Sequence, residues 1–512
     1  MKKLTLLFIA ALPMSSVMAQ DISDALIYAS EEIQGTARFR SMSGAFGALG
    51  GDMSAVSINP AGSAVFNISH ASMSLSSLNT NNDVSYFNGH NSSSESKIDL
   101  NQTGAVFVFD NTNRESNWKR FTLAIAYDKT SNYEDNWLAS GTNTNANGGL
   151  TNSIASYFTA YANGLRLDEI SAFPGESYSQ AYSEIGSTYG FANQQAFLGY
   201  ESYILEPAED TDGNTAYTAN VASGNFNHQY NYASTGYNGK INFNFASQFK
   251  DNFYIGLNLN SHFINYERST YLNETNSNAG SLITNIQFGN NLVTTGTGFS
   301  FQLGAIAKLT NELRVGLAYN SPTWYKIAEE TTQYISTRRN EGESVLTTVI
   351  NPNIVNVFPE YKLQTPGKLT GSLAYVFGDK GLISFDYSRK DYSNLKFKPT
   401  SDTYFSSLNR DMDELFKIAS TYRFGGEYRL KAFSLRGGYR FEESPYENEE
   451  FYGNLTGYSL GLGYNFGNMR LDLSFDQSKR EINQQLYSVG LTDAAGLDTK
   501  NTNVILTLGF NL

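Results

Sequence analysis

The sequence predicts an all-β fold, namely a transmembrane antiparallel β-barrel of about 14 strands with an N-terminal hatch, or plug, of short helices inside the lumen. Three observations lead to this prediction. Tyr and Phe occur 34 times each and Gly 44 times among the 512 residues, whereas charged residues make up only 17%. Apolar and polar residues alternate along many short segments. The connections between these segments are alternately short and long, as in outer-membrane barrels.

The first 19 residues have the pattern of an export signal. Lys2 and Lys3 give a positive start, a mostly apolar stretch follows, and Val17-Met18-Ala19 supplies the small residues that a signal peptidase needs. The apolar stretch is too short to span a membrane, so a membrane anchor is the weaker alternative. We expect residues 1–19 to be removed and the mature chain to begin at Gln20.

The strand prediction rests on alternation with a period of two residues. Phe121, Leu123, Ile125 and Tyr127 alternate with small or polar residues, and the segment 469–475 shows the same pattern. In a barrel the apolar set faces lipid and the polar set faces the lumen, whereas in a secreted soluble sandwich the apolar set would face a core. A single strand does not distinguish these two folds.

The pattern of connections favours the barrel. Short turns such as 250–252 and 431–432 are followed by long segments, of which 129–227 is the longest. Short periplasmic turns on one rim and long extracellular loops on the other are typical of outer-membrane barrels, and an even strand number places both chain ends in the periplasm. The predicted barrel covers residues 69–512, with strand segments at Ser69–Ser76, Gln102–Phe109, Trp118–Asp128, His228–Phe249, Phe253–Glu267, Gly298–Leu309, Leu313–Trp324, Lys368–Phe377, Leu382–Arg389, Thr421–Leu430, Phe433–Phe441, Gly457–Phe466, Met469–Lys479 and Asn503–Leu512.

The C-terminal residues are predicted to form the closing strand. Val504, Leu506, Leu508, Phe510 and Leu512 share one face up to the chain end. Such a strand resembles the segment that the barrel-assembly machinery recognises, although it ends in Leu512 instead of an aromatic residue. We therefore expect this machinery as a partner during insertion, and outer-membrane lipid and lipopolysaccharide as partners of the folded barrel.

Composition excludes several classes of function. The net charge of −13 is unfavourable for nucleic-acid binding, because phosphates require Lys and Arg. There is no Cys, which excludes disulfides and thiolate chemistry. The four His residues lack the spacing of a metal pair, so we expect no enzyme, no metal and no cofactor. No apolar run long enough for a transmembrane helix follows the signal.

The segment before the first strand, residues 20–68, is predicted to be the hatch. A barrel of about 14 strands has a lumen wider than a packed interior, so it must be filled to prevent leakage. Gly35–Phe66 is rich in Gly, Ala and Ser and lacks strand alternation, which suits short helical pieces that pack closely. Asn59-Pro60-Ala61-Gly62 is a predicted turn, because Asn bonds its own backbone, Pro fixes φ and Gly permits positive φ.

Residues 35–66 resemble the N-terminal hatch of the FadL/TodX family of outer-membrane transporters. The resemblance lies in Gly-x-x-Arg at Gly35–Arg38 and in the NPAG turn at Asn59–Gly62. Three later segments resemble family strands and extend the similarity over most of the mature chain: Val315–Pro322, Leu363–Phe385 and Tyr422–Pro445. The hatch with its NPAG turn is the specific part of this resemblance.

The resemblance implies a monomeric barrel for passive uptake of hydrophobic small molecules, such as long-chain fatty acids or aromatic compounds. Family members pass the substrate to a site near the hatch and release it sideways through a break in a strand, usually the third. The predicted third strand, Trp118–Asp128, has no Gly or Pro to mark such a break. The lateral exit therefore has no support from the sequence of that strand.

Two sets of site residues follow from the resemblance. If the ligand is a carboxylate, a cation in the lumen should meet it, unless that cation pairs with an acid of the wall. The hatch motif residues are Gly35, Arg38, Asp52, Asn59, Pro60, Ala61 and Gly62, and the candidate ligand contacts are Arg38, Arg40 and Phe46.

The longest connection, 129–227, is predicted to be partly helical. Ile154–Leu165 and Ala181–Leu205 carry aromatic and apolar residues at spacings near three and four. An amphipathic helix in an external loop needs a cover for its apolar face. Either the loop packs on itself or caps the barrel, or it offers an apolar landing site for the substrate.

Two other functions remain as alternatives. A haemin receptor would use His262 or a Tyr as an iron ligand. His262 lies on the same face of its predicted strand as Asn258 and Asn260, which predicts that it points into the lumen and forms hydrogen bonds. A structural or adhesive barrel would bind surfaces through its long loops and would not need a hatch.

Overall fold

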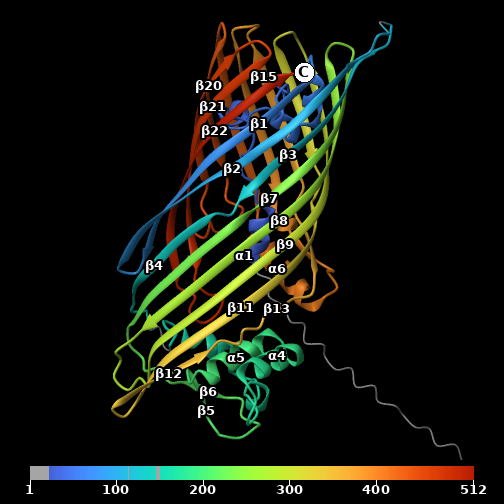
Figure 1. Ribbon diagram of the computed structural model, residues 1–512. Helices are drawn as coiled ribbons and strands as arrows, with labels where there is room; N and C mark the ends of the chain where they lie inside the picture. The colour runs from blue at the N-terminus through green and yellow to red at the C-terminus, as the bar shows by residue number, and fades with distance from the viewer. Residues whose placement is uncertain (1–21, 114, 146–149) are drawn as a thin grey trace, which may run out of the picture.

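The wall of the protein is a closed antiparallel barrel of 14 strands, as predicted. The computed structural model describes residues 22–113, 115–145 and 150–512, so the predicted export signal lies outside the described residues. Figure 1 shows a tall, tilted barrel whose bore holds the N-terminal segment. Pairing of the last strand with the first, from His70–Asn511 to Ser85–Gly496, closes the wall.

The wall strands follow one another in chain order. Four wall positions are built from two or more strands in sequence, because the chain is briefly irregular partway up the wall. The first six wall positions are β1 (His70–Tyr86), β2 (Gly89–Asp110), β3 (Trp118–Asn132) continued by β4 (Asp135–Asn143), β7 (Phe226–Phe249), β8 (Phe253–Thr275) and β9 (Ile283–Lys308). The next three positions are β10 (Leu313–Asn320) continued by β11 (Trp324–Glu341); then β12 (Ser344–Ile350), β13 (Asn356–Val357) and β14 (Tyr361–Gln364) leading into β15 (Lys368–Val376); and then β16 (Gly381–Asp391) with β17 (Lys396–Lys398). The last five are β18 (Ile418–Leu430), β19 (Phe433–Glu442), β20 (Leu455–Asn465), β21 (Met469–Gln485) and β22 (Ala494–Asn511).

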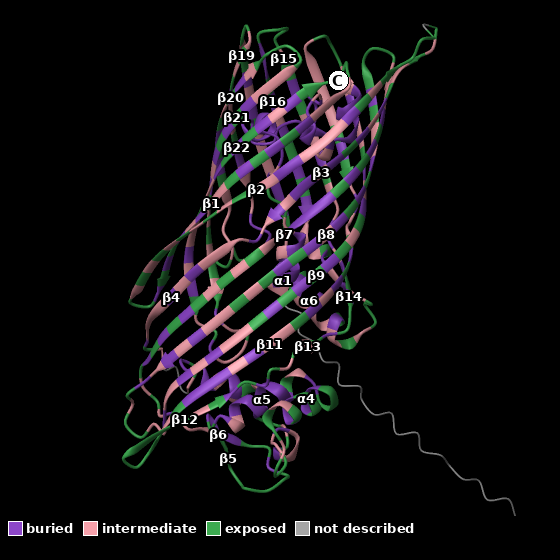
Figure 2. Ribbon diagram, in the orientation of Figure 1, coloured by how far each residue is buried: buried purple, intermediate pink, exposed green. Residues whose placement is uncertain are grey.

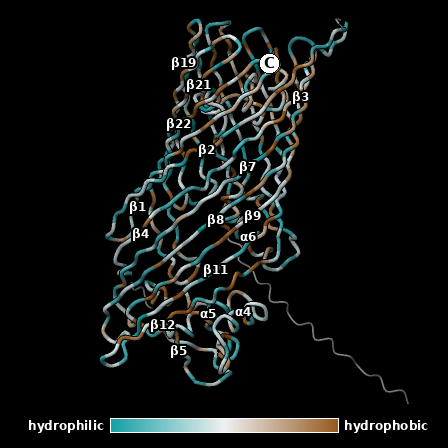
Figure 3. The backbone as a smooth tube through the Cα atoms, in the orientation of Figure 1, coloured by the Kyte–Doolittle hydropathy of each residue, from teal (hydrophilic) through white to brown (hydrophobic). Residues whose placement is uncertain are grey.

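The outer face of the wall is apolar, as the alternation predicted. On β3, Phe121 and Ile125 are exposed, whereas Ala124 and Ala126 are buried toward the bore. Buried and exposed residues alternate along the wall strands in Figure 2, and hydrophobic and hydrophilic residues alternate in Figure 3. Exposed apolar side chains on every second residue suit a wall that faces lipid. None of the helices in the described part of the chain is both long enough and apolar enough to cross a membrane.

The strands extend well beyond the predicted segments at the end opposite the C-terminus. β1 and β2 continue until they meet in the turn Phe87-Asn88, so the prediction of a long loop at 77–101 was wrong. This part of the hairpin is rich in Ser and Asn on both faces. Beyond the lipid the outer face meets water and is polar like most of the inner face, so the strand continues by backbone pairing without apolar alternation and cannot be recognised by that criterion.

A helical cap covers the end of the barrel opposite the C-terminus (Figure 1). It contains α3 (Ala155–Ala162), η3 (Leu167–Glu169), α4 (Tyr178–Thr188), α5 (Phe191–Glu201) and the hairpin of β5 (Leu205–Pro207) and β6 (Tyr217–Ala219). The first predicted helix is confirmed. The second is two helices, because Gly190 has a φ of +97° and ends the helical path between them.

The apolar faces of the cap helices pack onto the barrel. Phe158 of α3 and Phe197 of α5 are fully buried, and the ring of Phe158 lies 5.1 Å from that of Phe288 on β9. Tyr157 and Tyr487 join the same cluster. Of the two interpretations of this loop, the structure therefore shows the loop that caps the barrel.

Candidate functional site

The hatch lies inside the bore and consists of short helical pieces. These are α1 (Ile22–Ala29), α2 (Ala37–Arg40), η1 (Ser54–Ser57) and η2 (Pro60–Val65). Thr36 caps α2 by accepting a hydrogen bond from the N–H of Phe39, and Asp52 holds this cap by accepting hydrogen bonds from Thr36 Oγ1 (2.8 Å) and the N–H of Ser54 (3.0 Å). Asp52 therefore connects the start of α2 with the start of η1.

The NPAG turn begins η2 and joins the hatch to the wall. Asn59 Oδ1 accepts a hydrogen bond from the N–H of Ala61, and Pro60 occupies the first helical position. Asn59 Nδ2 donates to the carbonyl oxygens of Gly47 (2.7 Å) and Ala305 (3.0 Å). The buried side chain of Asn59 thus forms hydrogen bonds within its own turn, with the rest of the hatch and with strand β9.

Glycines of the wall allow the hatch backbone to lie directly on the strands. A Cβ at Gly304 would lie 2.0 Å from Asn59 Oδ1, and a Cβ at Gly256 would lie 2.4 Å from the carbonyl carbon of Pro60. Side chains larger than hydrogen would push the hatch off the wall. Further glycines meet the hatch in the same way: Gly316, Gly425, Gly438 and Gly461.

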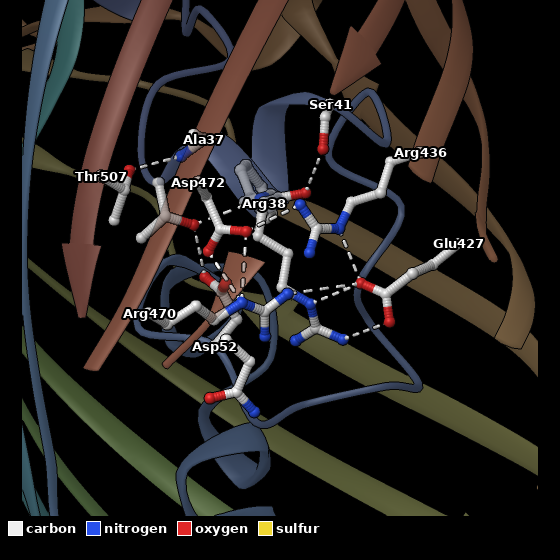
Figure 4. Close-up of polar contacts among 12 residues, drawn as sticks. Ala37, Arg38, Ser41, Asp52, Glu427, Arg436, Arg470, Asp472 and Thr507 are labelled. Atoms are coloured by element: carbon white, nitrogen blue, oxygen red, sulfur yellow. Dashed lines mark hydrogen bonds and ion pairs between the residues drawn. The ribbon is translucent and has the colours of Figure 1, made fainter. Parts of the chain in front are cut away.

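Buried ion pairs fix the hatch to the opposite side of the wall (Figure 4). Arg38 Nε lies 3.0 Å from Glu427 Oε2, and Arg436 Nε donates to the same oxygen at 2.7 Å. Arg436 also contacts Asp472, which pairs with Arg470. The side chain of Glu427 is fully buried, so its charge is stabilised by these guanidinium groups and not by water.

The remaining predicted contact residues also have partners in the described structure. Arg40 forms two hydrogen bonds with Asp476, at 2.9 and 2.7 Å. The guanidinium of Arg38 lies 5.2 Å from the ring centre of Phe46. The N–H groups of Phe46 and Gly47 both donate to Asp386 Oδ2 at 3.0 Å. The structure therefore places Arg38, Arg40 and Phe46 in contacts between hatch and wall.

Sequence reasoning found the hatch residues but missed their partners on the wall. Asp386, Glu427 and Asp476 lie on β16, β18 and β21 with their side chains buried toward the bore. In the sequence, each of them is an acidic residue at a strand position that faces the lumen. That signal identifies a lumen acid, but it does not say which hatch cation the acid meets.

An aromatic cluster surrounds α1 in the middle of the bore, and we call it the α1 cluster. Leu26 and Tyr28 of α1 are buried against wall aromatics. The ring of Tyr28 meets the edge of Tyr266 at 6.1 Å, and its hydroxyl donates to Thr294 Oγ1 at 3.0 Å. Further members come from the wall and from α6 (Thr403–Leu415): Tyr325, Tyr361, Phe397, Phe405 and Met412.

Polar contacts bound the α1 cluster at both ends of the helix. At its start, Asp24 pairs with Arg268 at 2.6 Å. Just after its end, Glu31 Oε2 lies 2.5 Å from Lys368 Nζ, and Glu31 Oε1 lies 3.9 Å from Lys390 Nζ. Lys390 also donates to the carbonyl oxygen of Ala29 at 2.6 Å. The helix and Glu31 thus place an apolar body next to a carboxylate held by two lysines.

The third strand contains a break that its sequence did not reveal. β2 and β3 pair from Asp110–Arg120 only as far as Gln102–Asp128, although both strands continue. The register of β3 against β7 shifts between Lys129 and Ser131. A bulge requires only one extra residue in the strand, and Gly or Pro is not essential.

Side chains close the gap left where this pairing ends, and we call this zone the seam. Lys129 Nζ lies 2.7 Å from Asp99 Oδ2, and Lys97 pairs with Glu134. Asn136 Nδ2 donates to Glu95 Oε2 at 2.5 Å. The seam is therefore held by polar side chains in place of a backbone ladder.

An apolar groove of about 530 Å³ lies on the outer face of the wall behind the NPAG turn. Its floor includes Gly256 and Gly304, the two glycines against which Asn59 and Pro60 pack from inside. The walls of the groove are outward apolar residues such as Phe245. The barrel is therefore one backbone thick where the hatch motif touches it.

His262 and His228 are hydrogen-bonded residues inside the barrel. His262 is buried, and its Nε2 lies 2.8 Å from Ser300 Oγ, with the ring of Tyr325 beside it. This agrees with the prediction that His262 points inward and forms hydrogen bonds. His228 lies between Tyr86 and Glu274 near the cap. Among the described residues, no group of three or more His, Cys, Asp or Glu could hold a metal ion.

Comparisons with known proteins agree with this geometry. The family model of outer membrane protein transport proteins (OMPP1/FadL/TodX) matches residues 212–512. Among solved structures, the chain is similar to a Pseudomonas aeruginosa FadL homologue, with a TM-score of 0.53 and 12% identity over 94% of this chain and 99% of that chain. The P. putida toluene transporter TodX gives a TM-score of 0.51 and 12% identity over 94% and 99% of the two chains.

The two structural matches are too distant in sequence to show more than the fold. A comparison with curated proteins finds no match. The family model, however, covers more than half of the chain, including the wall from β7 to the closing strand. On this ground the chain belongs to the outer membrane protein transport family (OMPP1/FadL/TodX).

Proposed function

We propose that the protein takes up hydrophobic small molecules passively across the outer membrane. The observation that carries this proposal is the α1 cluster, an aromatic zone in the middle of the bore. Sites for such ligands are mostly apolar with a few polar groups that fix orientation. A water-filled pore would not need aromatic residues in the bore, so the cluster favours a path for apolar molecules.

We place the ligand site where α1 now lies. Leu26 and Tyr28 fill an apolar space lined by wall aromatics. A ligand that displaces α1 replaces these apolar contacts with its own, so the exchange costs little. The rest of the hatch, residues 35–66, is held by the ion pairs and glycine contacts described above and keeps ions out during the exchange.

The lysines beside α1 favour a carboxylate ligand. Glu31 holds a carboxylate between Lys368 and Lys390 directly after an apolar helix. A long-chain fatty acid has the same order of groups, an apolar body followed by a carboxylate. We propose that its carboxylate takes the place of Glu31, and that Arg38, Arg40 and Phe46 anchor the hatch instead of contacting the ligand.

The seam is the proposed exit. Because β2 and β3 lack backbone pairing beyond Gln102–Asp128, separation of a few side chains would open the wall there. The outward residue Ile98 near this point is 77% exposed, so the seam begins beside apolar surface. Ligand leaving the bore at this level would pass into lipid without crossing the anchored hatch.

Ligand binding tests the proposed site. The purified full chain in detergent is titrated with a fluorescent polyene fatty acid and with its methyl ester. Phe405→Ser should weaken binding of both by roughly tenfold or more, because a buried aromatic contact is lost. Lys368→Gln should weaken binding of the acid by about tenfold and leave the ester unchanged. Phe173→Ser, on an exposed residue of the cap, is the matched control.

Three outcomes would contradict the proposed site or ligand. If Phe405→Ser and Phe173→Ser gave equal affinities, the α1 cluster would not be the site. If toluene displaced the probe while unlabelled fatty acid did not, the ligand class would be neutral aromatic compounds. Haemin displacing the probe more tightly than fatty acid would favour the haemin receptor.

We further propose the expected route to the membrane. Removal of residues 1–19 is supported by their export-signal pattern. Insertion by the barrel-assembly machinery is supported by the outward face of β22, where Val504, Leu506 and Phe510 are exposed. A monomer is supported by the closure of the barrel within one chain. Mass spectrometry of the mature N-terminus and the native mass in detergent test these two points.

A further inference from the structure

Three lysines form a row across neighbouring strands on the outer wall. Lys326 of β11 is directly opposite Lys362 of β14, and Lys362 is directly opposite Lys398 of β17. Their chain neighbours Leu363 and Phe397 are buried toward the bore. Because side chains alternate along a strand, the three lysines point outward. We call them the lysine row.

The lysine row is unfavourable for the isolated protein. Like charges directly opposite each other destabilise a strand pair. Lys326 pairs with Glu360. In the part of the chain that the structure describes, no ion pair involves Lys362 or Lys398. The chain carries a net charge of −13, so three adjacent cations are not a by-product of a basic surface. An anion bound from outside would remove the repulsion.

Exposed aromatic residues beside the lysine row indicate its depth in the membrane. Trp324 precedes Lys326 by two residues on the same outward face and is 45% exposed, and Phe299 opposite it is 47% exposed. Exposed aromatic residues of this kind mark the boundary between hydrocarbon and headgroups. β11 runs from this boundary toward the end that carries the cap. The lysine row is therefore at headgroup depth on the external side.

We propose that the lysine row binds the phosphate groups of lipopolysaccharide in the outer leaflet. Lysine binds phosphate as a point charge, and three lysines in register present a surface wide enough for more than one phosphate. Lys396 of β17 is not counted in the row, because its Nζ donates to the carbonyl oxygen of Asn409 on α6 at 3.4 Å. Contacts of the lysine row with phosphate would fix the rotation of the barrel relative to the lipid and seat its outer rim at the headgroup layer.

Binding of labelled lipid A to the full chain in detergent tests the proposal. The variant Lys326→Gln/Lys362→Gln/Lys398→Gln should weaken binding of diphosphorylated lipid A by roughly tenfold or more, because each lysine contributes to the electrostatic attraction of the phosphate groups. A matched control, Lys250→Gln/Lys380→Gln/Lys431→Gln, removes the same charge from short turns at the opposite rim. It should stay within about twofold of the wild type. Migration of unheated samples in gels checks that each barrel is folded.

Three results would overturn the proposal. Equal affinities of the two triple variants would show that only net charge matters. Dephosphorylated lipid A that binds as tightly as the diphosphorylated form would exclude phosphate recognition. Inorganic phosphate that displaces lipid A at equal concentration would assign the row to a free anion. None of these results depends on the ligand of the bore, so the uptake proposal would stand in each case.

Discussion

The two halves of the bore are filled by different physical means. Toward the short turns, residues 35–66 are held by buried ion pairs, side-chain amides and backbone that lies directly on wall glycines. Toward the cap, the bore is filled by aromatic packing around α1 and beneath α3 and α5. Polar contacts with fixed geometry suit a part that stays in place, whereas apolar packing can accept a different apolar occupant.

The largest expected effect on the polar half of the bore comes from substitution of Glu427. Its fully buried carboxylate is shared by Arg38 and Arg436. Glu427→Gln should loosen the hatch by about 3–5 kcal/mol, because the buried Arg38 loses its carboxylate partner and Arg436 keeps only Asp472. The frequency of ion-conducting openings in planar bilayers measures this effect. Glu449→Gln breaks the exposed pair with Lys417 and should change the opening frequency little. Equal behaviour of the two variants would contradict the anchoring role of Glu427.

The second-largest expected effect concerns the contacts between the hatch and the wall glycines. Gly304→Ala would place a methyl group 2.0 Å from Asn59 Oδ1 and should displace the NPAG turn at a cost of roughly 1–3 kcal/mol. Gly371→Ala, on β15, meets no atom within 4 Å and is the control. Openings in bilayers should become more frequent only with Gly304→Ala. An unchanged Gly304→Ala barrel would mean that the hatch does not depend on this close approach.

Much of the fold could be predicted from the sequence, because lipid on one side and a polar bore on the other force alternation along each strand. The segments around Phe121 and Phe475 were found in this way. The strand extensions at 77–101 could not be found, since polar residues occupy both of their faces and the pattern disappears. The break after Asp128 was missed for a related reason, because a bulge changes pairing without changing composition.

The site was predicted only in part. The hatch motif was recognised from Gly35 to Gly62, and Asp52 and Asn59 lie where local hydrogen bonding requires them. The partners Glu427 and Asp386 are hundreds of residues away in the chain. Their pairing depends on how the wall closes, which alternation along one strand does not encode.

The smallest effect concerns the seam. Lys129→Met removes the ion pair with Asp99 and should speed release of fatty acid from proteoliposome-bound protein by about fivefold or less, since one partly exposed pair contributes about 1 kcal/mol. Arg166→Met, which breaks an exposed pair with Asp168 in the cap, is the control. A lower release rate with Lys129→Met would place the exit elsewhere.

Ion conductance of hatch deletions tests most directly whether residues 35–66 close the bore. Removal of residues 22–62 should convert a closed barrel into a stable pore in planar bilayers, because the lumen of a barrel this wide is not filled by its wall side chains alone. Removal of residues 22–29 alone should leave the barrel closed, since the anchored part remains. A barrel that stays non-conducting after removal of residues 22–62 would contradict the central claim that the hatch seals the bore.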